Sequence, residues 1–281
     1  MLVTEIKSLN NIDKYNVDLL IVPTKFSSVS DFCVQLNELN IFKDKKIALK
    51  IDKIITEYEL EELDLFIKET LEYNISYYLF TDMSVYYILK KYNKHDKSVF
   101  FSKTINCSSY DIKEYNKLNI KCLVSTELQL DDLVKISNLE NNFIYSYGYF
   151  NIFYSKRHLL SLYKTYSNLN YQSKNKKYTL LEETRKEFYP VIENDNGTFI
   201  YSCYCLLLFK ELELLNKNNY FYIDSNFIEE DNLFNIINIY NELMKSGYSD
   251  DLYNKIKQID ENIGTSFMYL KPEILKEKNN G

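Results

Sequence analysis

Arginine, histidine and glycine are scarce in this chain, yet one short stretch contains an example of each. Residues 148–163 read GYFNIFYSKRHLLSLY and include Gly148, Arg157 and His158. The whole chain of 281 residues has 5 glycines, 2 histidines and, counted from the sequence, two arginines. An arginine fork binds carboxylates or phosphates through two hydrogen bonds, and a histidine can bind a metal or carry a proton. This stretch is therefore the first candidate for a binding or catalytic site.

A basic segment continues from this stretch. Both arginines, Arg157 and Arg185, and six lysines lie between residues 156 and 186. The chain as a whole has a formal net charge of -6, which disfavours general polyanion binding because nucleic-acid phosphates are bound by a surplus of basic residues. We interpret the segment either as a solvated lysine-rich loop or as a site for an anionic ligand, and both interpretations stay open.

The remaining residues that could do chemistry are scattered. His95 and His158 lie far apart in the sequence, and the 5 cysteines do not have the spacing of a zinc site. The sequence contains neither a glycine-rich phosphate loop nor the glycine pattern of a serine nucleophile elbow. Several cysteines lie in apolar runs, which is typical of reduced thiols, so we expect a cytoplasmic protein. We also expect neither a signal peptide nor a membrane span, because no apolar run is long enough.

Short apolar runs alternate with amphipathic segments along the chain. We expect eight strands, at residues 2–6, 17–23, 45–51, 75–81, 98–102, 121–125, 142–147 and 220–224. Helices are expected at residues 57–73, 83–92, 108–117, 130–138 and 230–246. Strands and helices that alternate in this way predict a parallel sheet, and eight strands predict an α/β fold of the (β/α)8 TIM-barrel type. An open, doubly wound sheet is the alternative.

The regular alternation fails between residues 154 and 219. This segment contains the turn-forming residues NDNG at 194–197 between short apolar runs, which indicates a small β-hairpin. We interpret residues 154–219 as an insertion after the seventh strand of a single barrel domain that spans residues 1–281. Because loops at the carboxyl ends of barrel strands carry function, the insertion is expected at the functional face.

The opening stretch resembles the collagenase-like peptidase family U32. Gly148, Tyr154-Ser155, Arg157 and Leu159-Leu160-Ser161 stand in the order and spacing of a motif in that family. Further similar segments follow in family order: VSTEL at 124–128, YTLLEE at 178–183, ENDNGTFIY at 193–201, YFYID at 220–224 and GTSFMYLKP at 264–272. The similarity is clear over roughly residues 120–272, and in the first half only the strand rhythm carries it.

The resemblance also shows what this chain has replaced. In the family, cysteines of this region can hold an iron–sulfur cluster, whose ligands must be thiolates. The corresponding positions here are Asn151, His158, the segment near Gln172, and Leu207. An amide, an imidazole and an isobutyl group cannot replace thiolates, so we predict no cluster, no metal and no cofactor.

Ser155-Lys156-Arg157 is most similar to the shorter of two paired family members that act in tRNA wobble-uridine hydroxylation, which is associated with prephenate as oxygen donor. The resemblance therefore implies a non-catalytic partner subunit, a pseudoenzyme that forms a heterodimer with a cysteine-bearing paralogue and also contacts tRNA. An active collagenase-like peptidase is one alternative, and a barrel that binds a small anionic metabolite through its two arginines is another. No catalytic residue is nominated. The candidates for substrate or partner binding are Ser125, Thr126, Glu127, Ser155, Lys156, Arg157 and Arg185.

Overall fold

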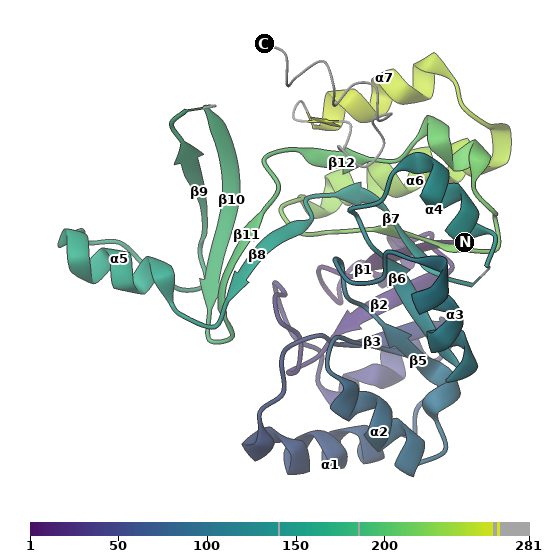
Figure 1. Ribbon diagram of the computed structural model, residues 1–281, viewed down its shortest axis with the longest axis horizontal. Coiled ribbons are helices and arrows are strands. Elements are labelled where there is room, and N and C mark those ends of the chain that lie inside the picture. The colour runs from purple at the N-terminus through teal and green to yellow at the C-terminus, as the bar shows by residue number, and fades with distance from the viewer. Residues whose placement is uncertain (140, 185, 261–262, 265–281) are drawn as a thin grey trace.

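Eight parallel strands close into a barrel in the computed structural model, which describes residues 1–139, 141–184, 186–260 and 263–264 (Figure 1). Strand β13 pairs with β1 on one side and with β7 on the other, so the sheet has no free edge inside the barrel. The prediction of a (β/α)8 TIM-type barrel is confirmed, and each expected strand overlaps an observed one. The barrel strands are β1 (Leu2–Glu5), β2 (Leu19–Pro23), β3 (Ile47–Ile51), β4 (Ile75–Phe80), β5 (Ser98–Phe100), β6 (Ile120–Val124), β7 (Phe143–Gly148) and β13 (Tyr220–Ile223).

Helices cover the outside of the barrel where the apolar periodicity placed them. In α1, the spacing of Leu63, Phe66 and Ile67 puts all three side chains on the buried face. Between β2 and β3 the connection contains a 3₁₀ helix instead of an α-helix. The helices of the barrel are α1 (Leu60–Thr70), α2 (Met83–Lys91), α3 (Ser109–Lys117), α4 (Leu130–Ser137), α6 (Glu230–Ser246) and α7 (Asp250–Ile259), and the 3₁₀ helices are η1 (Ile12–Lys14), η2 (Leu36–Phe42), η3 (Glu57–Glu59), η4 (His95–Lys97) and η5 (Lys210–Leu214).

Aromatic rings fill much of the barrel interior, which gives the high tyrosine content a structural use. Phe143 stacks on Tyr220 with ring centroids 4.6 Å apart, and Phe101 meets the edge of Tyr222 at 5.1 Å. Offset and edge-to-face pairs of this kind add stability beyond the area that they bury. No helix among the described residues is both long and apolar enough to cross a membrane.

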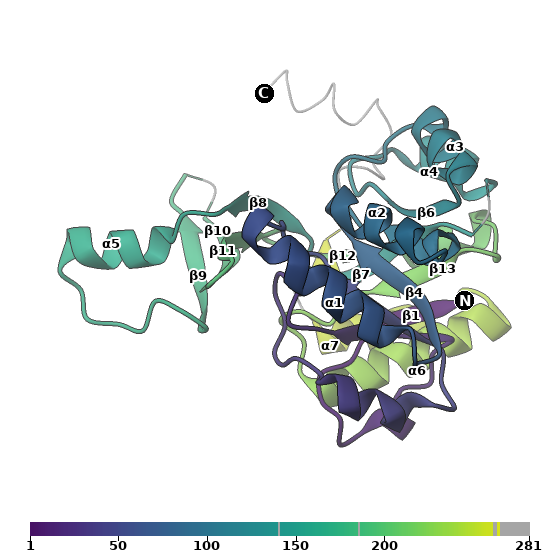
Figure 2. The same cartoon turned by 90° about the horizontal axis from the view of Figure 1, so that it is seen from below.

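A second, antiparallel sheet leaves the barrel after β7. Its strands are β8 (Asn151–Ser155), β9 (Lys177–Glu182), β10 (Glu187–Asn194) and β11 (Gly197–Tyr201), in the spatial order β8-β11-β10-β9, and α5 (Leu159–Ser167) lies between β8 and β9 in sequence. We call residues 151–201 the arm. Figures 1 and 2 show the arm extending away from the barrel, with α5 far from the barrel helices. The sequence led us to expect a hairpin from residue 154; the sheet has four strands and begins at Asn151, because β8 pairs with β11.

The chain returns from the arm through β12 (Cys205–Leu207), which pairs antiparallel with β7 and parallel with β14 (Ile263–Gly264). Two glycines are essential where the chain enters the arm after β7 and where it turns from β10 into β11. Gly148 at the end of β7 has φ +125°, and a Cβ there would lie 2.8 Å from the Cβ of Asp224. Gly197 has φ +132°, and a Cβ there would lie 2.2 Å from the carbonyl oxygen of Ser155. A side chain at either position would clash, so glycine is required at both.

Candidate functional site

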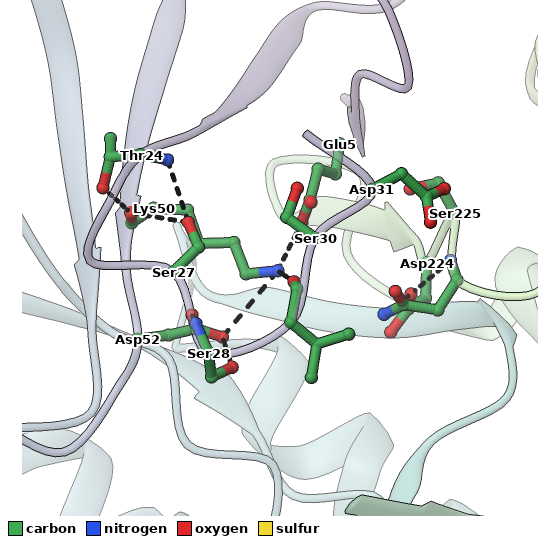
Figure 3. A network of polar contacts seen from close by, with 12 residues as sticks. Glu5, Thr24, Ser27, Ser28, Ser30, Asp31, Lys50, Asp52, Asp224 and Ser225 are labelled. Carbon is green, nitrogen blue, oxygen red and sulfur yellow. Dashed lines mark hydrogen bonds and ion pairs between the residues drawn. The ribbon is translucent and has the colours of Figure 1, made fainter. Parts of the chain in front are cut away.

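Charged side chains meet at the carboxyl ends of the barrel strands. Glu5 ends β1, Lys50 lies near the end of β3, and Asp224 directly follows β13. Carboxyl ends of parallel strands lie at the same face of a barrel, so residues distant in sequence converge there. Figure 3 shows this group, with the Lys50 side chain directed towards its partners and Asp224 to one side of it. This is the face at which TIM-barrel proteins place their active or binding sites.

Lys50 is the centre of the group. Its Nζ donates hydrogen bonds to Glu5 Oε2 at 2.6 Å and to the carbonyl oxygen of Val29 at 2.7 Å, and lies 3.9 Å from Asp52 Oδ2. The Lys50 and Glu5 side chains are each only 5% exposed. Burial alone would lower the pKa of Lys50, but the nearby carboxylates of Asp52 and Glu5 outweigh it and raise that pKa. Lys50 therefore stays protonated and is a fixed positive charge.

Asp224 forms a second buried ion pair beside the first. Lys103 Nζ donates to Asp224 Oδ2 at 2.9 Å, and the backbone N–H of Asn226 donates to Asp224 Oδ1 at 2.9 Å. Burial would raise the pKa of Asp224, but Lys103 and the Asn226 N–H reverse this and hold the pKa below its usual value. The carboxylate is thus ionised, and Lys103 is held at the barrel mouth.

Three tyrosines surround this carboxylate and remain protonated. Burial first, and the negative charge of Asp224 second, raise the pKa of Tyr145, Tyr201 and Tyr222 well above the usual value. A phenol with a raised pKa cannot serve as a base near neutral pH, but it can donate a hydrogen bond. The site therefore combines phenol hydrogen-bond donors with the fixed charges of Lys50 and Asp224.

A pocket of about 610 Å³ lies between these strand ends and the arm. Its size is that of a small-molecule site. The barrel provides one wall and the arm the other, with Lys50, Asp52, Lys53, Thr56, Thr81, Lys103 and Asn226 among the barrel residues, and Asn151, Tyr154, Lys156, Asp195, Asn196, Phe199 and Tyr201 from the arm.

Hydrogen bonds fix the arm over the barrel mouth. Asn194 Nδ2 donates to the Ser28 carbonyl oxygen at 2.8 Å, and Asn196 Nδ2 donates to the same oxygen at 3.0 Å. Ser28 in turn donates from its backbone N–H to Asp52 Oδ1 at 2.7 Å. The arm turn is thus linked through one serine to the charged group of the barrel, and the pocket wall has a defined position.

The cations of the pocket differ in whether a carboxylate neutralises them. Lys50, Lys53 and Lys103 are each within 2.9 Å of a carboxylate oxygen, in Glu5, Glu59 and Asp224 respectively. Lys156 is exposed and forms no ion pair within the part of the chain that the structure describes. It is therefore the pocket cation that remains available to a ligand.

The predicted binding residues at and after the end of β8 differ in their position relative to the pocket. Lys156 lines the pocket, whereas its neighbour Arg157 is exposed and does not line it. Ser155 Oγ accepts a hydrogen bond from the Arg157 backbone N–H at 3.2 Å, and so shapes this loop. Arg185 lies outside the described residues.

The other predicted group, Ser125, Thr126 and Glu127, directly follows β6 and contacts a loop that lines the pocket. The Thr126 backbone N–H donates to the Lys103 carbonyl oxygen at 3.1 Å, and Ser125 Oγ accepts from the Glu127 N–H at 3.1 Å. The Glu127 side chain is exposed. The Thr126 N–H therefore positions the loop of Lys103, whereas Ser125, Thr126 and Glu127 are themselves absent from the pocket lining.

Sequence reasoning missed the charged group itself. Lys50, Asp52 and Asp224 stand within or directly after apolar runs that the sequence analysis had assigned to strands. A charge at the carboxyl end of a buried barrel strand is a recognisable signal, because such a position faces the functional end of the fold. That signal was available and would have identified the site.

The residues present do not fit an iron–sulfur cluster. Asn151 Nδ2 donates to the carbonyl oxygens of Phe153 and Ile200, and Leu207 is buried in β12. Burial raises the pKa of the thiols of Cys33, Cys203 and Cys205, and that of Cys122 to about 12, so these four are neutral thiols near pH 7. Within the described residues, no three His, Cys, Asp or Glu side chains gather as metal ligands would.

Fold and site together define a TIM barrel with a charged, small-molecule-sized pocket at the carboxyl ends of its strands. The sequence profile of peptidase family U32 matches residues 31–278, and the chain belongs to that family. No curated protein matches the chain. A solved structure, described as that of the U32 peptidase Mk0906, aligns with a TM-score of 0.45 and 11% identity over 79% of this chain and 91% of that chain.

Proposed function

We propose that this U32-family chain binds a small anionic metabolite in the pocket between the barrel mouth and the arm, and that it is non-catalytic. The observation that carries the proposal is the pocket of about 610 Å³ in which Lys156 has no carboxylate partner among the described residues. The fixed charge of Lys50 and the side chains of Asn151, Asn196 and Asn226, all in the pocket lining, would orient such a ligand.

The non-catalytic part of the proposal is supported by the state of the candidate nucleophiles. Four of the five thiols have raised pKa values, so they lack the thiolate that attacks a carbonyl. His158 has a buried Nε2 atom without a hydrogen-bond partner, and His95 has a buried Nδ1 atom in the same condition. Within the described residues neither histidine is hydrogen-bonded to a serine or cysteine, as a general base for a nucleophile would be.

Calorimetric titration tests the pocket. The ligands are small carboxylic acids of the aromatic pathway, prephenate among them, with an amide analogue that lacks the charge as a comparison. Lys156→Gln should weaken binding about tenfold or more, the loss of one charge-assisted hydrogen bond. Arg157→Gln is the matched control: it removes the neighbouring charge outside the pocket and should bind as the wild type does. Equal losses in the two variants would contradict the assignment, and so would hydrolysis of a gelatin-type substrate by the pure protein.

A second candidate is the role of partner subunit in tRNA wobble-uridine hydroxylation, in a heterodimer with a cysteine-bearing paralogue. Two observations favour it: the cluster cysteines are replaced here, and residues 151–181 contain six basic residues and no acidic one. Deletion of this chain should then abolish 5-hydroxyuridine-type modification of tRNA, and the paralogue should co-purify with it. Unchanged tRNA modification after deletion would reject this role and leave the pocket proposal standing.

A further inference from the structure

The arm exposes apolar side chains that a soluble domain normally buries. Helix α5 buries Leu160 but exposes Leu162 by 58%, Tyr163 by 56% and Tyr166 by 88%. Leu169, just after the helix, is 53% exposed. Leu162, Tyr163 and Tyr166 lie within the helix, with Tyr166 four residues after Leu162 and three after Tyr163, so these three share one side of α5. A contiguous apolar surface of this kind marks an interaction site.

Helix α5 is also poorly supported within its own chain. It has nine residues, and isolated helices of that length are marginal in water. Its main attachment is at its first turn, where the Glu193 carboxylate accepts hydrogen bonds from the backbone N–H groups of Leu160 and Ser161 at 2.7 and 3.2 Å. The rest of the helix therefore needs a further surface to pack against.

The positive charge of α5 and its flanking residues restricts which kind of surface can pack against the helix. Residues 151–181 include six basic residues and no acidic one, although the chain is acidic overall. Lys164 and Lys176 form no ion pair within the described residues. Leucines have no good partner on a nucleic-acid backbone, whereas an acidic protein surface with apolar side chains complements both features.

The chain itself offers such a surface on α1. Residues 57–72 contain seven acidic residues and one lysine. Tyr58, Glu61, Leu65 and Glu69 are exposed, and their spacing places them on one face of η3 and α1, with Tyr58 at 99% exposure. Glu61 and Glu69 form no ion pair within the described residues. Figures 1 and 2 show α5 and α1 well apart within one chain, so the two surfaces cannot meet except between chains.

We propose that α5 and the segment after it bind the η3–α1 face of a second copy of this chain. When each copy places its arm on the α1 face of the other, the exchange is reciprocal and closes a two-fold dimer. Burial of Leu162, Tyr166 and Tyr58 supplies the apolar contact, and the opposite charges fix which surfaces pair. The proposal is independent of the pocket ligand.

Charge reversal tests this pairing. The first variant, Lys164→Glu with Lys176→Glu, places two negative charges on the arm; the second, Glu61→Lys with Glu69→Lys, makes the α1 face basic. The wild type should be a dimer by light scattering after size exclusion at micromolar concentrations. Each variant alone should dimerise at least about tenfold more weakly, because its arm and α1 face then repel. An equimolar mixture should regain the dimer, since each arm again meets an α1 face of opposite charge.

Two controls separate this result from unfolding or another interface. Leu162→Glu should give a monomer with an unchanged circular dichroism spectrum, while Tyr87→Glu, at an exposed residue of α2, should leave the dimer intact. A wild type that stays monomeric, or a mixture of the two reversed variants that does not dimerise, would overturn the proposal. So would a wild type that is monomeric alone and associates only with RNA or with a paralogous chain.

Discussion

The barrel and the arm differ in how deeply their strands and helices are buried. Every residue of β2, β3 and β7 is buried, and the barrel has no free edge. In the arm, β9 is an edge strand with mostly exposed side chains, and α5 buries one residue. The barrel therefore buries far more of its strands than the arm does, although the arm has a small apolar core of its own, with Val191 and Phe199 buried. The pocket lies where these two regions meet.

The first prediction concerns the buried ion pair of Lys50 and Glu5 in the barrel. Lys50→Met should destabilise the protein by about 3–5 kcal/mol, because the buried Glu5 carboxylate loses its partner. Urea unfolding measures this, and Lys117→Met, which removes an exposed partner of Glu114, should cost at most about 1 kcal/mol. Adding Glu5→Leu to Lys50→Met should recover part of the loss. A cost for Lys50→Met no larger than that for Lys117→Met would show that the barrel mouth is solvated.

The second prediction concerns a substitution that should destabilise the arm and leave the barrel unchanged. Gly197→Ala should cost about 1–3 kcal/mol, because alanine is strained at φ +132° and its Cβ would meet the Ser155 carbonyl oxygen. Hydrogen exchange should become faster in β8 and β11 and stay unchanged in β2 and β3.

Gly247→Ala provides the comparison for that variant. Gly247 also has positive φ, +82°, but the added Cβ would meet only the flexible end of the Glu213 side chain, at 3.0 Å. Its effect should be smaller and confined to the end of α6. Faster exchange throughout the barrel in Gly197→Ala would mean that the two regions unfold together.

The same contrast explains what the sequence could predict. The eight barrel strands were located because a buried parallel strand is a near-continuous apolar run, as in IALKI at 47–51. The sequence predicts only a hairpin in the arm, because the pairing of β8 with β11 joins residues more than forty apart in the chain. The alternation of apolar and polar residues that marks a strand is also weak where both faces of the strand are exposed. Lys156 was nominated from local charge, while Lys50 and Asp224 converge only through barrel closure. The pocket therefore required the structure.

A third, smaller effect is expected at the first turn of α5. Glu193→Gln removes the negative charge at the helix N-terminus, where it interacts favourably with the unpaired N–H groups, and turns one of the two accepting oxygens into an NH2 donor. The loss should be about 1 kcal/mol, seen as faster hydrogen exchange in residues 159–167. Glu187→Gln in the same strand is the control, because Glu187 lies at the opposite end of β10 from α5. An equal effect of the two substitutions would argue against helix capping by Glu193.

The smallest effect tests a polar contact on the barrel side of the pocket. The Glu59 carboxylate pairs with Lys53 at 2.6 Å and accepts from the Thr56 hydroxyl at 2.7 Å and the Thr56 N–H at 2.9 Å, and these contacts lower its pKa from 4.5 to about 2. The folded state thus binds fewer protons than the unfolded state below the usual pKa of a glutamate, so the stability that Glu59 contributes is present above that pKa and lost as the pH falls towards about 2. Because the side chain is partly exposed, the contribution should be under about 1 kcal/mol.

Urea unfolding of the wild type and of Glu59→Gln checks this contribution. Glutamine can still accept from the Thr56 N–H but cannot pair with Lys53, so the wild type should be the more stable protein near neutral pH. That advantage should shrink from about pH 5 to about pH 3, because the carboxylate is protonated ever more readily in the unfolded chain. A difference that is constant with pH would assign the contribution to side-chain shape, and the pocket wall at Lys53 would then not depend on the charge of Glu59.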